Sequence, residues 1–65
     1  MYPNLIIAMK AAGMTQKQLA GMLGIAETTL SRKMTEQQDF SLTQARKIAR
    51  ILEPHSLDFL FEKKD

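Results

Sequence analysis

Apolar residues recur at intervals of three and four along this chain, a spacing that predicts amphipathic helices rather than strands. Five segments show it: residues 4–12, 15–23, 26–34, 41–52 and 56–61. The residues that this spacing turns inward are Leu5, Ala8, Met9, Ala12, Leu19, Met22, Leu23, Ala26, Leu30, Met34, Leu42, Ala45, Ile48, Ala49, Leu52, Leu57, Leu60 and Phe61. The pattern therefore predicts an all-α protein.

Capping residues mark the ends of several predicted helices. Thr15 with Gln18, and Ser41 with Gln44, match the capping-box pattern at a helix N-terminus. Gly24 follows the last apolar residue of its segment, where a left-handed residue ends a helix at little steric cost. Further boundaries are predicted at Gly13, Pro54 and Ser56.

The second and third predicted helices are short and almost contiguous. Gly24 forms the turn between them, and Ile25 follows as an apolar plug. Ala20 is small, which suits a position where two helices crossing at a steep angle approach closely. The third helix presents mainly polar and basic residues outward. This arrangement predicts a helix-turn-helix.

A family resemblance rests on these residues and on others downstream. The matching groups are Thr15-Gln16-x-x-Leu19-Ala20, Leu23-Gly24-Ile25, Thr29-Leu30-Ser31-Arg32, Phe40-Ser41-Leu42, Lys47-Ile48-Ala49, Ile51-Leu52 and Ser56-Leu57-Asp58-x-Leu60-Phe61. From about Leu5 to Phe61, the chain resembles the XRE family of helix-turn-helix proteins, the Cro and repressor type of phages and bacteria. The resemblance implies a compact five-helix, lambda-repressor-like fold whose third helix lies in the major groove. It also implies a sequence-specific regulator that binds double-stranded DNA, with a phage or prophage Cro-type repressor as the expected kind.

The outward residues of the third helix are the candidates for reading bases, namely Glu27, Thr28, Ser31 and Arg32. Thr28 and Arg32 are four apart and share a face. The guanidinium fork of Arg32 matches the O6 and N7 acceptors of guanine, and Thr28 can touch a thymine methyl. Glu27 either accepts a hydrogen bond from a cytosine amino group or complements the helix dipole. Ser31 suits a base edge or, more readily, the DNA backbone.

Contacts to the DNA backbone are expected from Thr15, Gln16, Lys17, Thr29, Lys33, Gln37 and Gln38. In the resembled family, the glutamine at the position of Gln16 bridges to a phosphate or a base edge. The loop of residues 34–40 departs from the family, which often has a glycine and basic residues there. Glu36 and Asp39 repel phosphate, so we expect hydrogen bonds from the two glutamines but no ionic contact.

The fourth predicted helix has a basic outer face made by Arg46, Lys47 and Arg50. The simplest interpretation is a solvated surface. The resembled family docks this helix on DNA by its N-terminus, where free N–H groups bind a phosphate, rather than by its flank.

The bulk composition excludes several classes of function. The chain has 65 residues, no cysteine, one histidine and a formal net charge of +2. We therefore expect one domain over residues 1–65, with no disulfide, no metal site and no cofactor. Its longest apolar run is too short to span a bilayer, and no signal-peptide layout is present. A cytoplasmic protein with no membrane and no small-molecule ligand is expected. No nucleophile–base pair or phosphate-binding glycine loop indicates an enzyme.

A domain of this size offers a small footprint on DNA, so tight binding is expected to need two copies on a pseudo-palindromic operator. We expect a homodimer, at least on DNA, that meets through Phe59 and the C-terminal tail or through Ile6 and Ile7. The competing hypothesis is a protein-interaction module that uses the same scaffold to bind a partner such as a toxin. The acidic residues near the DNA-facing surface favour that alternative slightly.

Overall fold

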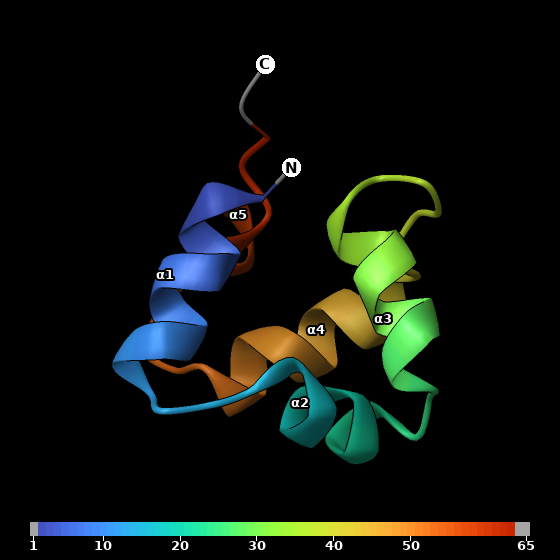
Figure 1. The fold of residues 1–65 in the computed structure, drawn as a ribbon. Helices are drawn as coiled ribbons and strands as arrows, with labels where there is room; N and C mark the ends of the chain where they lie inside the picture. The colour runs from blue at the N-terminus through green and yellow to red at the C-terminus, as the bar shows by residue number, and fades with distance from the viewer. Residues whose placement is uncertain (1, 64–65) are drawn as a thin grey trace.

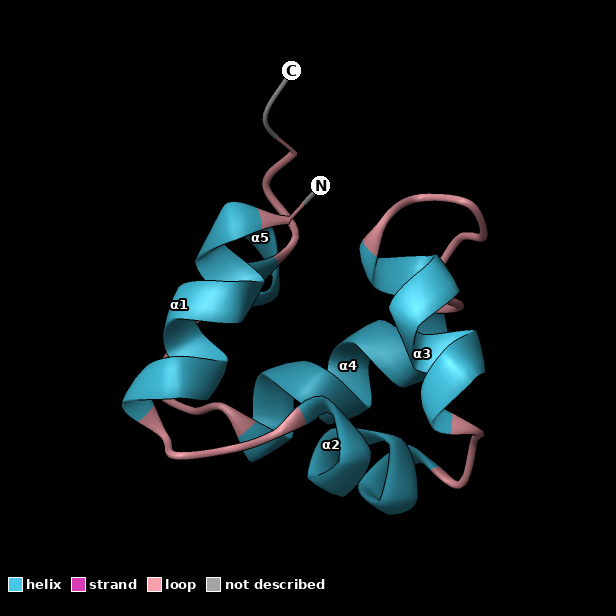
Figure 2. Ribbon diagram, in the orientation of Figure 1, coloured by secondary structure: helices cyan, strands magenta, loops and turns pink. Residues whose placement is uncertain are grey.

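Five helices and the turns between them make up residues 2–63, the part of the chain that this computed structural model describes. Their bounds are Pro3–Ala11 (α1), Gln16–Leu23 (α2), Glu27–Met34 (α3), Leu42–Ile51 (α4) and Leu57–Leu60 (α5), and no strand occurs among these residues (Figure 2). The prediction of an all-α protein is confirmed. The first helix begins at Pro3 and ends at Ala11, one residue earlier at each end than the pattern indicated.

The helices form the lambda-repressor-like arrangement that the resemblance implied. In Figure 1, α1 and α5 lie together on the left, α3 stands on the right, and α2 lies below, with α4 crossing behind. The two ends of the described chain also meet, since the Lys63 ammonium lies 6.0 Å from the centroid of the Tyr2 ring.

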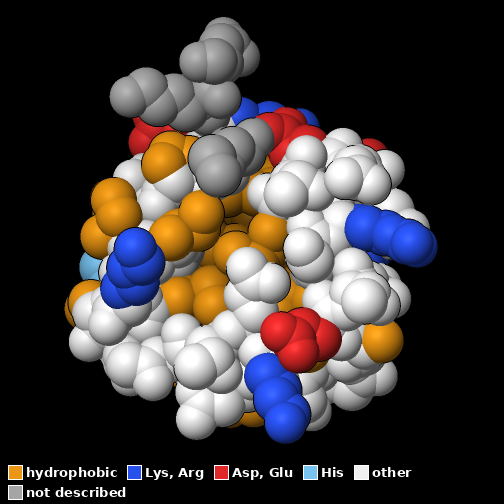
Figure 3. Space-filling view, in the orientation of Figure 1, with side chains coloured by type: hydrophobic (Ala, Val, Ile, Leu, Met, Phe, Trp, Pro, Cys, Tyr) orange, Lys and Arg blue, Asp and Glu red, His pale blue; other side chains and the backbone are white. Residues whose placement is uncertain are grey.

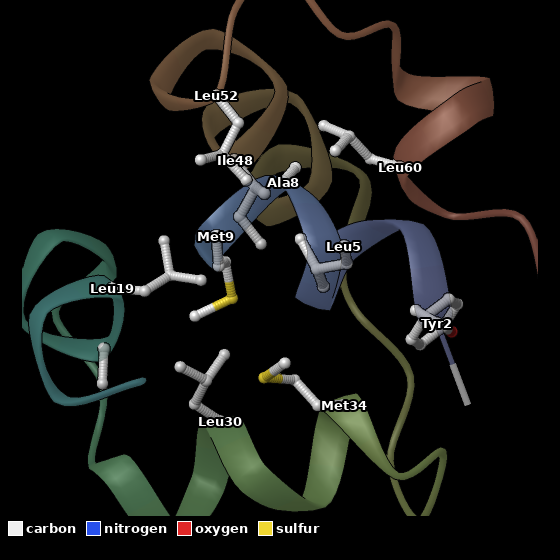
Figure 4. Packing of buried hydrophobic residues seen from close by; sticks show 11 residues of the cluster. Tyr2, Leu5, Ala8, Met9, Leu19, Leu30, Met34, Ile48, Leu52 and Leu60 are labelled. Carbon is white, nitrogen blue, oxygen red and sulfur yellow. The ribbon is translucent and has the colours of Figure 1, made fainter. Parts of the chain in front are cut away.

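One fully buried aliphatic side chain from each helix forms the centre of the core. These residues are Leu5, Leu19, Leu30, Ile48 and Leu60, each 0% exposed (Figure 4). Within the described part of the chain, no buried side-chain nitrogen or oxygen lacks a hydrogen-bond partner. The core is therefore apolar throughout, and each helix is attached to it by at least one leucine or isoleucine.

Four residues that the pattern turned inward are exposed instead: Ala12, Met22, Ala26 and Leu42. Met22 is 50% exposed because α2 packs through Leu19, Ala20 and Leu23, which places Met22 at the edge of that face. Leu42 is 60% exposed; it is the first residue of α4, a full turn before the inward stripe begins at Ala45. Ala12 and Ala26 are helix caps, so they lie outside the regular helix and its spacing does not predict which way they face.

An aromatic cluster, which the sequence pattern did not indicate, closes one end of the core. Tyr2 is only 5% exposed, and its ring meets Phe40 edge to face at 5.8 Å and Phe61 at 5.5 Å. Phe40 and Phe61 pack on each other at 5.2 Å. Tyr2 is therefore part of the core, and it holds the loop after α3 against the end of α5.

The expected helix caps are present at the N-termini of α2 and α4. Thr15 with Gln18, and Ser41 with Gln44, each make both hydrogen bonds of the capping box. At the C-termini, the chain passes through a left-handed residue after α1, α2 and α3, at Gly13, Gly24 and Glu36. The first two are glycines, for which a positive φ is cheap; Glu36 is not.

Candidate nucleic-acid interface

The angle between α2 and α3 is set by a single left-handed residue. Gly24 has φ 70° and ψ 30°, and its N–H donates to the Gly21 carbonyl at 3.2 Å. The N–H of Ile25 donates to the Ala20 carbonyl at 3.0 Å, which completes the Schellman pattern of bonds at the end of α2. Ala20 is 2% exposed, as expected for the crossing point. The predicted helix-turn-helix is confirmed.

The N-terminus of α2 lies next to this turn and is held by its capping box. The Thr15 hydroxyl accepts a hydrogen bond from the Gln18 N–H at 3.1 Å, and the Gln18 amide oxygen accepts from the Thr15 N–H at 2.9 Å. The side chains of Gln16 and Lys17 are exposed in the first turn. Since the first N–H groups of a helix have no intrahelical partner, this end offers donors to an anion beside both side chains.

The structure brings the four candidate base-reading residues together on the outer side of α3. Leu30 and Met34 anchor the helix in the core, with exposures of 0% and 4%. The exposed residues on the remaining surface are Glu27, Thr28, Ser31 and Arg32. Thr28 and Arg32 lie one turn apart on the same flank. Thr29, which was expected to contact the backbone, is half-buried.

Glu27 lies in the first turn of α3, and its carboxylate therefore complements the partial positive charge of that helix end. Ala26, the residue before it, has no side chain that can cap the helix. This geometry supports the dipole interpretation of Glu27 from the protein side. Its side chain also remains exposed on the same surface as Thr28.

The loop after α3 folds back onto the end of that helix. The N–H groups of Glu36 and Gln37 donate to the carbonyls of Lys33 and Arg32 at 3.2 and 2.9 Å, again a Schellman pattern. The residue at its left-handed position is Glu36, with φ 66°. Its carboxylate lies 3.4 Å from the Lys63 ammonium, so it points to the C-terminal segment. The exposed side chains of Gln37 and Gln38 follow Glu36 in the loop.

Lys33 is tied to the same loop. Its ammonium donates a hydrogen bond to the Asp39 carbonyl at 2.9 Å, and the side chain is half-buried. A lysine ammonium has three donors, so two are left for other acceptors. Lys33 thus stabilises the loop as well as standing near the surface where a phosphate contact was expected.

We term the surface formed by the start of α2, the outer side of α3 and the loop after it the reading surface. It carries three basic residues, Lys17, Arg32 and Lys33, and three acidic residues, Glu27, Glu36 and Asp39. The reading surface is therefore polar without being strongly basic. Hydrogen-bond donors, more than net charge, are what it offers to a ligand.

A methionine-rich groove borders the reading surface. It is lined by Ile6, Met9, Lys10, Met14, Gln16 and Met34. Figure 3 shows hydrophobic side chains at the floor of a depression between α1 and α3. Gln16 belongs to both the groove and the reading surface, so a molecule in the groove would lie against the first turn of α2.

Residues 2–63 hold no group of three His, Cys, Asp or Glu side chains close enough together to bind a metal ion. No helix in the same range is long and apolar enough to cross a membrane.

The sequence comparisons agree with this geometry. A family model described as Helix-turn-helix matches residues 5–60, which is most of the chain. This chain belongs to the XRE-type helix-turn-helix family. It is by that membership a DNA-binding regulator, and the matched range includes every residue of α2, α3 and the turn between them. No curated protein and no solved structure matches it.

Proposed function

We propose that this XRE-type protein is a transcriptional repressor of the phage Cro type that reads double-stranded DNA in the major groove with α3. One observation carries the proposal: the four candidate base-reading side chains share one exposed side of a helix that Leu30 and Met34 fix to the core. A helix presented in this way fits a major groove about 12 Å wide. The protein carries out no reaction in this proposal and needs no cofactor or small-molecule ligand.

The roles of individual residues follow from their chemistry. Arg32 reads a guanine through a bidentate hydrogen bond, and Thr28 contacts a neighbouring base edge or thymine methyl. Glu27 and Ser31 complete this set. Gln16 and Lys17 fix the position of the protein on a phosphate, with the first N–H groups of α2 beside them. Thr15, Thr29, Lys33, Gln37 and Gln38 add further backbone contacts.

We further propose that two copies bind a pseudo-palindromic operator. One module buries about 600–1,000 Å², which is small for tight specific binding, and two half-sites about 34 Å apart double the contact. The two candidate dimer surfaces lie on α1 and α5, which pack on each other, and each has an exposed apolar residue: Ile7 is 61% exposed and Phe59 is 40% exposed. The Asn4 amide donates to the Phe59 carbonyl at 3.0 Å and so joins α1 to α5 between them.

The decisive experiment is selection of bound duplexes from a random library, with the whole chain as bait. A common half-site repeated as an inverted pair about one helical turn apart supports the proposal. Recovery of duplexes with no shared sequence at about 50 mM salt would contradict sequence-specific reading, since electrostatic attraction alone does not distinguish bases.

The methionine-rich groove supports a second candidate function, in which the scaffold binds a partner protein as an antitoxin does. Methionine side chains adapt to varied apolar partners. The two functions differ in their response to salt. DNA binding through several phosphates weakens log-linearly with salt, whereas an apolar protein interface hardly responds.

A further inference from the structure

The outward side of α4 carries the most concentrated positive charge among the described residues. Thr43, Arg46, Lys47 and Arg50 line a shallow groove there, and no residue from another helix contributes to it. All four are exposed. Their spacing of three, four and seven residues places them in one row along the helix. We refer to these four residues as the α4 stripe.

No acidic residue within α4 balances the charges of the α4 stripe, and the nearest one along the chain is Glu53, three residues after Arg50. Residues 42–51 contain three basic side chains and no acidic one. These three side chains make no ion pair or hydrogen bond to any other described residue. Arg46 and Arg50 are four apart, a spacing at which like charges repel and destabilise a helix. An anionic ligand would relieve that repulsion, whereas the reading surface has almost no net charge to attract one.

The chemistry of the stripe selects among anionic partners. It contains no apolar or aromatic side chain, so an acidic protein segment would lack the buried anchor that protein interfaces depend on. A membrane surface requires the apolar side of a basic helix to be free, but Ala45, Ile48 and Leu52 of this segment are buried in the core. A DNA duplex requires neither an apolar anchor nor a free apolar helix face, because its phosphates are bound by charge alone.

The dimensions of the stripe also suit a duplex. From Thr43 to Arg50 a helix rises about 10 Å at 1.5 Å per residue. A duplex carries about one negative charge per 1.7 Å of its axis, so this length faces about six phosphate charges. Three cations in that length can each meet a phosphate without crowding one another.

The α4 stripe does not face the duplex that α3 would read. In Figure 4, Leu30 and Met34 of α3 point toward the core from one side, and Ile48 and Leu52 point toward it from the other. The outer surfaces of the two segments therefore look in opposing directions. A duplex in contact with the outer side of α3, and with the first turn of α4 as the resemblance implies, leaves Arg46, Lys47 and Arg50 open.

We infer that the α4 stripe binds the phosphate backbone of a second stretch of duplex, so that one protein copy can bridge two DNA segments. This inference rests on the proposed function for the first duplex only. The second contact is independent of sequence, because Arg46, Lys47 and Arg50 meet phosphates and not base edges.

The test compares two charge-matched double variants of the whole chain on a labelled random-sequence duplex of about 20 base pairs. Arg46→Gln with Arg50→Gln removes two charges from the stripe, and Lys10→Gln with Lys63→Gln removes two from elsewhere. Glutamine is a good helix former, so melting followed by circular dichroism should show the stripe variant folded. A third variant, Lys17→Gln with Arg32→Gln, disables the reading surface.

Two results are expected. The stripe variant should flatten the plot of log affinity against log salt by about 1.8, since each phosphate that it no longer neutralises lowers the slope by about 0.9, while the control hardly changes it. Sedimentation in an excess of duplex that carries the half-site selected for α3, at about 50 mM salt, should find two duplexes per copy for the unmodified chain and one for the stripe variant. The reading-surface variant should still bind one.

Each alternative outcome is distinct. An unchanged salt slope in the stripe variant overturns the inference. A flattened slope with only one duplex per copy shows that the stripe binds the same duplex as α3, which also overturns it. If polyglutamate at the same concentration of charges displaces the duplex from the stripe, the result would assign the stripe to an acidic protein. If the reading-surface variant keeps the sequence preference of the unmodified chain, the proposed function is contradicted. The inference about the stripe is not affected by that result.

Discussion

The guanidinium of Arg32 is exposed on α3, and the residue is fixed in place because Leu30 and Met34 on either side of it are buried. Lys17 is exposed in the first turn of α2, where an ammonium meets phosphate rather than a base edge. The two cations should therefore contribute differently to binding. One should determine sequence preference, and the other should contribute overall affinity.

Replacing Arg32 by alanine should reduce discrimination at one base pair by about 1–3 kcal/mol. Lys17→Ala should instead weaken all sequences alike and flatten the salt slope by about one unit. Binding measured on the selected operator and on single-base variants of it checks both effects. Equal losses on every sequence for both variants would show that Arg32 does not read a base.

Glu36 is a second residue with a measurable consequence. A left-handed conformation costs a residue with a Cβ about 1–2 kcal/mol, and the ion pair of the half-buried Glu36 with Lys63 offsets only part of that cost. Glu36→Gly should raise the free energy of unfolding slightly, by less than about 1 kcal/mol, after the entropy of glycine in the unfolded chain is deducted. Thermal melting of this variant beside Glu36→Ala checks the sign. The alanine variant keeps the strained backbone and should not gain stability.

At the scale of secondary-structure elements, the helix boundaries were the most predictable part of the fold. Thr15 and Ser41 are capping residues whose signal lies within four residues, so the sequence alone located both helix starts. Gly24 located the turn for the same reason. Glu36 was not predicted as left-handed, because its residue type disfavours that conformation and only the closure of the loop on α3 imposes it.

Two glycines of the helix-turn-helix allow the turn itself to be tested. A Cβ added at Gly24 or at Gly21 meets no atom within 4 Å, so any effect of alanine comes from the backbone. Gly24→Ala must hold a φ of 70° and should lose about 1–2 kcal/mol. Gly21→Ala lies inside α2 at an ordinary φ and should gain about 0.5–1 kcal/mol. Changes of the same sign in melting temperature would show that Gly24 is not left-handed.

At the scale of the whole molecule, the exposure of α3 was predictable but the closing of the core was not. Helical spacing identified Leu5, Leu19 and Leu60 as core residues, because each lies within a regular stripe. Tyr2 lies before the first helix, so no periodicity places it. Its burial depends on Phe40 and Phe61, which are distant in sequence and meet only in the folded chain. The exposure of the four candidate base-reading residues was predictable because it depends only on the outward side of one helix, while their role in reading bases stays a prediction.

The aromatic cluster should contribute a large part of the stability of so small a protein. Tyr2→Ala removes a buried ring with two edge-to-face partners and should lower the free energy of unfolding by about 3 kcal/mol or more. Tyr2→Phe keeps both ring contacts and should change it by less than about 1 kcal/mol. Urea unfolding of the two variants separates ring packing from any role of the hydroxyl. Similar urea midpoints for the two variants would show that the Tyr2 ring is not part of the core.

The convergence of one buried aliphatic side chain from every helix has a consequence for how the molecule opens. Because Leu5, Leu19, Leu30, Ile48 and Leu60 share one centre, no helix can detach without uncovering the others. Partial opening should therefore be rare, and the slowest amide protons of α3 should exchange with solvent through the same all-or-none event as those of α1. A peptide containing only the two helices of the DNA-binding motif should accordingly be unstructured in water.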